Sequence, residues 1–142
     1  MKTLIYGAGP IGQWLALRLG KAGNDVKLLA RGDKLQQLQK QGIVIVDGFT
    51  GESQAAQVPL VDRLGPEDHY DLVIVPMRKS SRLAVCPTLA ANTKVENILF
   101  LGNDIAGFHR YFDYLPEEKV LLGFPSVGGG MDGDDLVIVD RD

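Results

Sequence analysis

The feature that most constrains this chain is a cluster of glycines that follows an apolar run at the N-terminus. The segment GAGPIG, residues 7–12, comes directly after a short predicted strand, residues 2–6, and opens a helical stretch that continues to Ala22. A second apolar run, Val26–Ala30, completes a strand–helix–strand unit. In a unit of about 30 residues the G-x-G-x-x-G pattern is typical of dinucleotide binding. We therefore predict two parallel strands joined by a crossover helix, with an anion held where that helix begins.

Each glycine of this loop has a mechanical role in that interpretation. Gly7 permits a tight turn, Gly9 lets the backbone approach a pyrophosphate, and Gly12 lets the helix pack close to the strand. The helix dipole and the unpaired N–H groups of the first turn favour a negative charge there, and proline is well tolerated at that position. The alternative is an ordinary tight turn between a strand and a helix. The loop residues predicted to bind the cofactor are Gly7, Ala8, Gly9, Pro10, Ile11 and Gly12.

Arg31 follows the second predicted strand, where many dinucleotide-binding chains carry an acidic residue. An acid there hydrogen-bonds the ribose of NAD, whereas a guanidinium binds a 2′-phosphate through paired N–H groups. Since a charge-assisted hydrogen bond contributes about 1.5–3 kcal/mol, we expect a preference of about tenfold to hundredfold for NADP(H) over NAD(H). Lys34 adds to this positive field, and Asp33 is predicted to cap the next helix. The alternative for Arg31 is a solvated side chain at a strand end.

The remaining chain alternates apolar runs with helical stretches. Strands are expected at residues 43–46, 55–60, 72–75, 97–101, 120–124 and 136–139, and further helices at 33–41, 80–91 and 107–115. Ser80 or Ser81 is the expected cap of the helix ending at Ala91, which Pro87 should bend or shorten. This alternation predicts an α/β fold of the Rossmann type, a doubly wound, mostly parallel sheet with helices on both faces.

Size and charge limit the classes of function. The chain has 142 residues, which fits one domain spanning 1–142. Its net charge of −3 gives no general attraction to nucleic acid or to an anionic membrane. No apolar stretch approaches the roughly 18 residues that span a bilayer. The single cysteine excludes an internal disulfide and suits a reducing compartment. We expect a soluble, cytoplasmic protein without a nucleic-acid or membrane partner.

A few other residues invite a functional interpretation. His69 and His109 are far apart in the sequence and Cys86 has no close partner, so no metal site is predicted. Cys86 is interpreted as a buried apolar filler. Trp14 is expected in the core or against a neighbouring domain, with a place in the wall of the cofactor cleft as the alternative. Residues 128–130, three consecutive glycines, are expected to form a flexible loop, either an ordinary turn or part of an interdomain cleft.

Five segments in this order resemble the N-terminal domain of the ketopantoate reductase (2-dehydropantoate 2-reductase) family. They are GAGPIG, LLARGDKLQQLQKQGIVI, DLVIVPMRKSS, ILFLGNDIAGF and GFPSVGGGMDGDDLVIVD. The resemblance extends over essentially the whole chain. It implies a reductase that transfers a hydride from NADP(H) to the ketone of a small 2-oxo acid, as in the conversion of ketopantoate to pantoate in pantothenate biosynthesis.

The resemblance also implies roles for individual residues. Arg31 matches the family arginine that holds the 2′-phosphate. Arg78, with Lys79 beside it, stands where the family usually has a lysine near the cofactor phosphates and ribose. Asn103 keeps the amide of the family's Asn-Gly pair near the nicotinamide and the substrate, and Asp104 replaces the glycine of that pair. These two differences from the family pattern leave the identity of the 2-oxo acid open.

The family's C-terminal helical domain carries its catalytic lysine, and nothing in residues 1–142 corresponds to that domain. We therefore assign no catalytic residue here and expect cofactor binding without turnover. Apolar surface left by an absent partner domain favours self-association into a homo-oligomer. The alternative function is a stand-alone regulatory nucleotide sensor, similar to the regulatory domains of potassium transport systems. Those domains generally carry an acid where this chain has Arg31.

Overall fold

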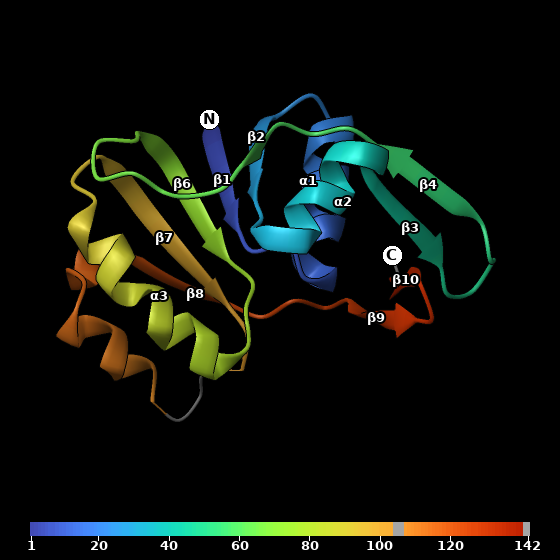
Figure 1. Cartoon of the computed structure of the whole chain (residues 1–142). Helices are drawn as coiled ribbons and strands as arrows, with labels where there is room; N and C mark the ends of the chain where they lie inside the picture. Colours follow the sequence, from blue (N-terminus) through green and yellow to red (C-terminus); the bar gives the residue numbers. More distant parts are fainter. Residues whose placement is uncertain (104–106, 141–142) are drawn as a thin grey trace.

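Six parallel strands form the main sheet of the computed structural model, which describes residues 1–103 and 107–140. The strands are β1 (Lys2–Tyr6), β2 (Asp25–Leu29), β5 (Leu60–Val61), β6 (Tyr70–Val75), β7 (Val95–Leu101) and β8 (Val120–Gly123). Their spatial order is β5-β2-β1-β6-β7-β8 (Figure 1). This is the strand order of the doubly wound dinucleotide-binding fold, so the predicted fold class is confirmed. The order reverses between β1 and β6, where ligands bind in such sheets.

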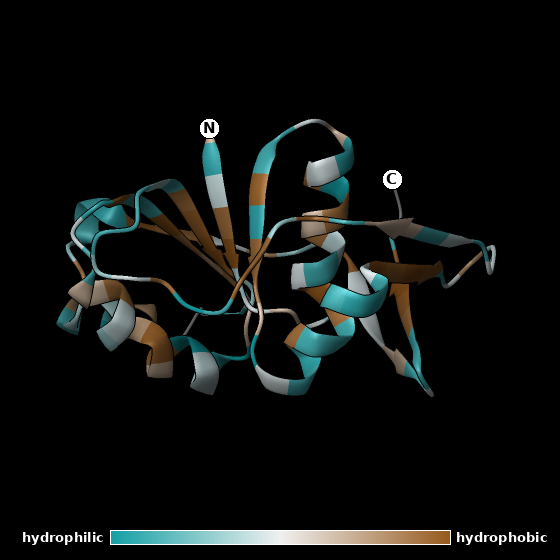
Figure 2. Ribbon diagram, turned by 45° about the horizontal axis from the view of Figure 1, so that its top comes forward, coloured by the Kyte–Doolittle hydropathy of each residue, from teal (hydrophilic) through white to brown (hydrophobic). Residues whose placement is uncertain are grey.

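Helices cover both faces of this sheet (Figure 1). On one face α1 (Pro10–Lys21) and α2 (Gly32–Gln41) bury Leu17 and Leu38 in a cluster with strand residues such as Ile5. On the other face α3 (Lys79–Ala91) packs its buried side chains against β6 and β7, together with the 3-10 helix η1 (Phe108–Asp113). A second 3-10 helix, η2 (Glu117–Lys119), precedes β8. Figure 2 shows hydrophobic residues along the strands that these helices cover.

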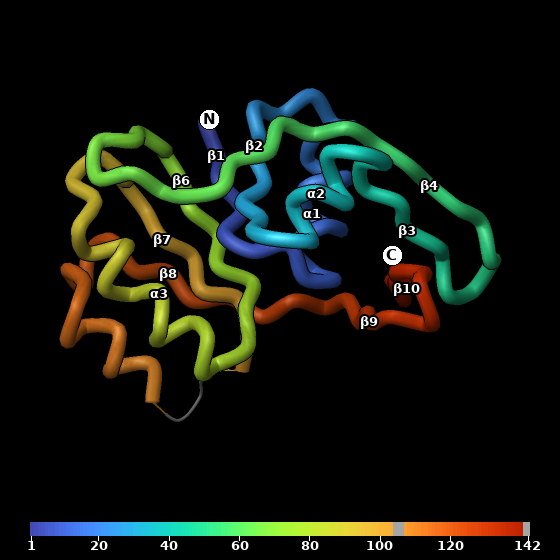
Figure 3. Tube along the Cα trace, viewed as in Figure 1, coloured from blue at the N-terminus to red at the C-terminus, as the bar shows by residue number. Residues whose placement is uncertain are grey.

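A second, four-stranded sheet packs beside α1 and was not predicted. It contains β3 (Ile43–Asp47), β4 (Ser53–Ala56), β9 (Gly128–Asp132) and β10 (Asp135–Val139), in the order β4-β3-β10-β9. The hairpin of β9 and β10 brings the C-terminal part of the chain next to the N-terminal helix (Figure 3).

The prediction of a flexible loop at residues 128–130 is therefore wrong. All three glycines belong to β9 and pair with β10. A Cβ atom at Gly129 would lie 2.4 Å from Cδ1 of Ile138 and 3.4 Å from Cβ of Pro10. The absence of a side chain thus lets this strand lie close to its neighbours. For the same reason, the sequence of residues 128–130 lacks the alternating pattern that predicts a strand.

Two helices begin earlier than predicted. Arg31 is the N-cap residue of α2, with extended backbone, so Asp33 lies in the first turn and is not the cap. Arg78 likewise precedes α3, so neither Ser80 nor Ser81 caps that helix. Neither cap residue makes a side-chain capping hydrogen bond.

Three further expectations need correction. Helix α3 continues through Pro87 to Ala91 rather than being shortened there. The predicted strand at 55–60 is two strands in different sheets, because the chain crosses from β4 to β5 and Pro59 precedes the second one. The helix expected at 107–115 is the 3-10 helix η1. In the described part of the chain, no helix combines the length and apolar character needed to cross a membrane.

Candidate dinucleotide-binding site

The predicted site residues lie at the carboxyl ends of four adjacent strands. Gly7 follows β1, Arg31 comes shortly after β2, Arg78 shortly after β6, and Asn103 shortly after β7. These strands are neighbours in the order β2-β1-β6-β7 and all run parallel. The residues therefore share one edge of the sheet, around the point where the strand order reverses.

The glycine loop between β1 and α1 has the geometry that its sequence predicts. Gly7 has a φ of +132°, a conformation that side chains disfavour. A Cβ at Gly12 would lie 2.0 Å from the carbonyl oxygen of Gly7, so only glycine fits there. A Cβ at Gly9, by contrast, would meet nothing within 4 Å, which leaves open space beside the backbone at the start of the helix.

Gln13, which the sequence did not single out, fixes the shape of this loop. Its Nε2 donates to the carbonyl oxygen of Ala8 at 2.8 Å, and its backbone N–H donates to that of Gly9 at 2.9 Å. The side chain is almost fully buried. The sequence did not indicate this role, because glutamine side chains in helices are mostly exposed.

Beside the loop lies a cavity of about 260 Å³. In its wall Nη2 of Arg31 donates a hydrogen bond of 3.0 Å to the hydroxyl of Tyr6. Tyr6 is only 1% exposed, whereas Arg31 is exposed, so a fixed phenol orients a guanidinium at the surface. A guanidinium has five N–H donors, and its bond to Tyr6 engages one of them. The lining residues are Tyr6, Gly7, Ala8, Leu29, Ala30, Arg31, Lys34, Met77 and Val85.

The other predicted residues take different positions. Lys34 lines the same cavity as Arg31, which brings a second positive charge to it. Arg78 and Asn103 are exposed at the same sheet edge but are not among the residues described as lining this cavity. Nζ of Lys79 lies next to Gly107, 3.3 Å from where a Cβ would stand. Asp104 lies outside the described residues.

Trp14 does not line this cavity. It lines a smaller one between α1 and the second sheet, with Ile45 and Ile138. The alternative that placed Trp14 in the wall of the cofactor cleft is therefore wrong. The expectation that Trp14 packs in the core is confirmed, because it is partly buried and packs against the buried cluster on that side.

A buried arginine joins the ends of β6 and β7 next to the site. Nε of Arg82 donates to the hydroxyl of Tyr111 at 2.9 Å, and Nη1 donates to the carbonyl oxygens of Met77 and, at 3.3 Å, Leu101. A Cβ at Gly102 would lie 2.1 Å from Nη1, so this position requires glycine. Arg82 thereby fixes the backbone just before Arg78 and just before Asn103. The sequence did not reveal this role, because Arg82 stands in a short basic cluster typical of an exposed helix start.

Cys86 lies on the buried side of the same helix and is fully buried. Desolvation raises the pKa of its thiol to about 11. The prediction that this cysteine is a buried filler and not a nucleophile agrees with both findings.

Residues 3–140 match the family model described as ketopantoate reductase PanE/ApbA. Among curated relatives, the uncharacterized oxidoreductase YkpB of Bacillus subtilis is 28% identical over 134 residues, which cover 93% of this chain and 43% of the relative. The 2-dehydropantoate 2-reductase of Mesorhizobium japonicum is 29% identical over 143 residues, which cover 99% of this chain and 39% of the relative.

Solved structures give the same fold. The ternary structure of D-mandelate dehydrogenase with NADH and anilino(oxo)acetate is 25% identical, with a TM-score of 0.82, and the match covers 99% of this chain and 46% of that one. The putative 2-dehydropantoate 2-reductase of Enterococcus faecalis is 24% identical, with a TM-score of 0.77 and the same coverage. The chain thus spans less than half the length of each of these four relatives. Because the family match extends over residues 3–140, the chain belongs to the ketopantoate reductase PanE/ApbA family of oxidoreductases.

Proposed function

We propose that this chain is the NADP(H)-binding part of a reductase that acts on a small 2-oxo acid. The observation that carries this proposal is the position of Arg31, which a buried tyrosine orients in the wall of a cavity beside the glycine loop. Family membership supports an oxidoreductase with a Rossmann domain. The proposed preference for NADP(H) over NAD(H) rests on the positive charge of Arg31 at this edge of the site.

The loop residues fit a dinucleotide pyrophosphate. The open space at Gly9 allows a phosphate to approach the backbone, and the tight packing at Gly12 brings the helix start close to it. The N–H groups of Ile11 and Gly12 belong to the first helical turn, where no preceding helical carbonyl accepts them. We assign the pyrophosphate to residues 7–12 and the 2′-phosphate to Arg31, with Lys34 adding positive charge to the same cavity.

The nicotinamide end of the cofactor is assigned to the strand ends on the other side of β1. When bound, the nicotinamide supplies the hydride that reduces a ketone carbon. Arg78 follows β6 and Asn103 follows β7, and the buried guanidinium of Arg82 holds the backbone before each of them. We propose that Arg78 contacts the cofactor phosphates and ribose and that Asn103 lies near the nicotinamide and the substrate.

The substrate class follows from the relatives. One relative is named for 2-dehydropantoate, and a solved neighbour, a D-mandelate dehydrogenase, holds anilino(oxo)acetate. Both compounds carry a carboxylate directly bonded to a carbonyl carbon, as a 2-oxo acid does. The group that protonates the developing alkoxide is assigned to the part of the longer relatives that this chain does not match, so we expect the chain alone to bind cofactor without turnover. No observation favours the stand-alone nucleotide sensor.

The proposal is tested by titrating the chain with NADPH and with NADH, followed by nicotinamide fluorescence. We expect the wild type to bind NADPH about tenfold to a hundredfold more tightly than NADH, and Arg31→Ala to lose that preference while still binding NADH. Lys40→Ala, which removes one positive charge elsewhere on α2, is the matched control and should retain it. Unchanged discrimination in Arg31→Ala contradicts the assignment of the 2′-phosphate, and absence of binding of either cofactor contradicts the proposed function.

A further inference from the structure

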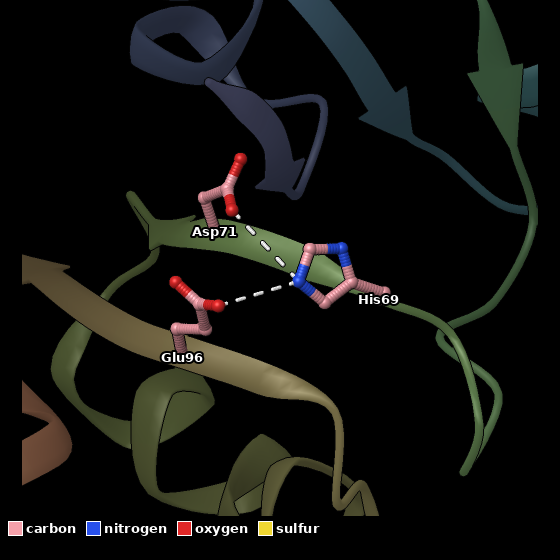
Figure 4. A group of neighbouring side chains, drawn as sticks. All are labelled: His69, Asp71 and Glu96. Carbon is pink, nitrogen blue, oxygen red and sulfur yellow. Dashed lines mark ion pairs between the residues drawn. The ribbon is translucent and has the colours of Figure 1, made fainter.

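We propose that His69, Asp71 and Glu96 form a binding site for a divalent cation of the zinc type. The three side chains meet at the amino ends of β6 and β7, the edge of the main sheet opposite the glycine loop (Figure 4). No metal site is predicted from the sequence, because His69 has no histidine or cysteine at ligand spacing. His69 directly precedes β6, Asp71 lies in β6, and Glu96 lies in the neighbouring strand β7, 25 residues after Asp71 in the chain.

Two of the distances between the donor atoms are close to the ligand spacing of a bound ion. Nε2 of His69 lies 3.8 Å from Oδ1 of Asp71 and 3.5 Å from Oε1 of Glu96, and all three donors lie within 4.8 Å of one another. Two ligands of a tetrahedral zinc ion with bonds of about 2.1 Å are about 3.4 Å apart. The three donors therefore need only small rotations to coordinate one ion.

Direct hydrogen bonding explains this arrangement less well. A charge-assisted bond between an imidazolium and a carboxylate is about 2.7–2.9 Å long, which is much shorter than the 3.5 and 3.8 Å found here. Two carboxylates on adjacent strands also repel each other. A dication bound by Asp71 and Glu96 would remove this repulsion. It would also occupy the space between these carboxylates and the imidazole of His69.

Contacts with residues outside the cluster fix the positions of some of its side chains. Oδ2 of Asp71 accepts a hydrogen bond of 2.6 Å from the backbone N–H of Lys2, which leaves Oδ1 directed toward His69. Strands β6 and β7 are paired on both sides of Asp71 and Glu96, which fixes these two residues next to each other. Such outer contacts orient the ligands of metal sites in general.

The chemical types of the three donor atoms favour some cations over others. One imidazole nitrogen and two carboxylate oxygens suit Zn²⁺, which accepts mixed nitrogen and oxygen ligands and keeps a fourth position for water. Mg²⁺ and Ca²⁺ prefer sets made of oxygen alone. An ion here would join the segment before β6 to β7, and because the unfolded chain does not bring these residues together, binding would stabilise the folded state.

The test uses the full chain, freed of any purification tag, titrated with ZnCl₂ by calorimetry and by thermal unfolding. We expect one ion per chain and a higher melting temperature at saturation. His69→Asn and Glu96→Gln should each weaken binding at least tenfold. His109→Asn is the matched control, because it removes the other histidine of the chain, which lies in η1, and it should bind like the wild type.

Three results of these titrations would overturn the proposal. They are wild-type affinity in His69→Asn, loss of binding in His109→Asn, and several weak sites in place of one saturable site. Both ligand positions are more than half exposed, at 51% for His69 and 60% for Glu96, so the variants should keep the fold, which far-ultraviolet circular dichroism checks. A zinc anomalous signal between the three side chains in a crystal would support the site, and a signal elsewhere would contradict it.

Discussion

The hydroxyl of Tyr6 accepts a hydrogen bond of 3.0 Å from Nη2 of Arg31. Tyr6 is the last residue of β1 and Arg31 is the N-cap residue of α2, so this bond joins the carboxyl ends of two adjacent strands. It gives an exposed cation a fixed direction at the edge of the cavity next to the glycine loop. The proposed selectivity for NADP(H) depends on this orientation as well as on the charge.

Removing the tyrosine hydroxyl should therefore reduce selectivity without removing the cation. In Tyr6→Phe the ring remains packed and one hydrogen bond is lost, at a cost of about 0.5–1.5 kcal/mol. We expect the ratio of NADH to NADPH dissociation constants to fall by about twofold to tenfold. Tyr114→Phe, at an exposed tyrosine, is the control. Fluorescence titration that shows equal ratios in the wild type and Tyr6→Phe would mean that Tyr6 does not orient the guanidinium.

Alanine substitutions at Gly9 and Gly12 should have different effects on stability and on NADPH binding. A Cβ at Gly9 meets nothing within 4 Å, so Gly9→Ala should keep its stability and lose affinity for NADPH. A Cβ at Gly12 meets a backbone oxygen at 2.0 Å, so Gly12→Ala should lose at least about 1–3 kcal/mol of unfolding free energy. Urea unfolding and NADPH titration of both variants separate the two effects. A stable Gly9→Ala variant with wild-type affinity would place the pyrophosphate elsewhere.

Arg82 should matter for both stability and binding. Arg82→Met leaves the carbonyl oxygens of Met77 and Leu101 without this donor, which we expect to cost about 2–5 kcal/mol of unfolding free energy. Arg110→Met, at an exposed arginine, should cost almost nothing. Tyr111→Phe removes the hydrogen bond from Nε of Arg82 and should cost about 0.5–1.5 kcal/mol. A stability of Arg82→Met equal to that of Arg110→Met would show that the buried guanidinium does not hold these strand ends.

Cys86 should be inert in the folded chain. Burial raises the pKa of its thiol to about 11, so at pH 8 roughly one thiol in a thousand is ionised. We expect no reaction with a disulfide reagent at pH 8 in the native state and one reactive thiol per chain in denaturant. Because the charged form is the reactive one, reactivity should rise as the pH approaches 11. Rapid stoichiometric labelling of the native chain at pH 8 would contradict the burial of this side chain.

Most of the main sheet could be predicted, because its strands are dense apolar runs and its first turn requires glycine. The order of the strands was not predicted, because the crossover rule fixes the handedness of each connection and not which strands are neighbours. The second sheet could not be predicted in the same way. The sequence predicts strands at 43–46 and 136–139, where β3 and β10 lie, but nothing in those runs shows that they pair with each other. Residues 128–130 have no side chains to show a strand period, and the polar sequence of β4 resembles a surface loop.

Some residues of the candidate site could likewise be predicted from the sequence, and others could not. The loop of residues 7–12 and Arg31 follow local patterns, so the sequence could predict them as site residues. Tyr6 and Arg82 act through contacts with residues far away in the chain, and neither residue type indicates this on its own. The cluster at His69 arises from the pairing of two strands, which no spacing within the sequence shows.

The most direct test of the central proposal is a crystal structure of the chain with NADPH. We expect the pyrophosphate over the backbone of residues 9–12 and the 2′-phosphate of the adenosine within hydrogen-bonding distance of the Arg31 guanidinium. A cofactor that lies elsewhere, or an adenosine ribose directed away from residue 31 at full occupancy, would contradict the account.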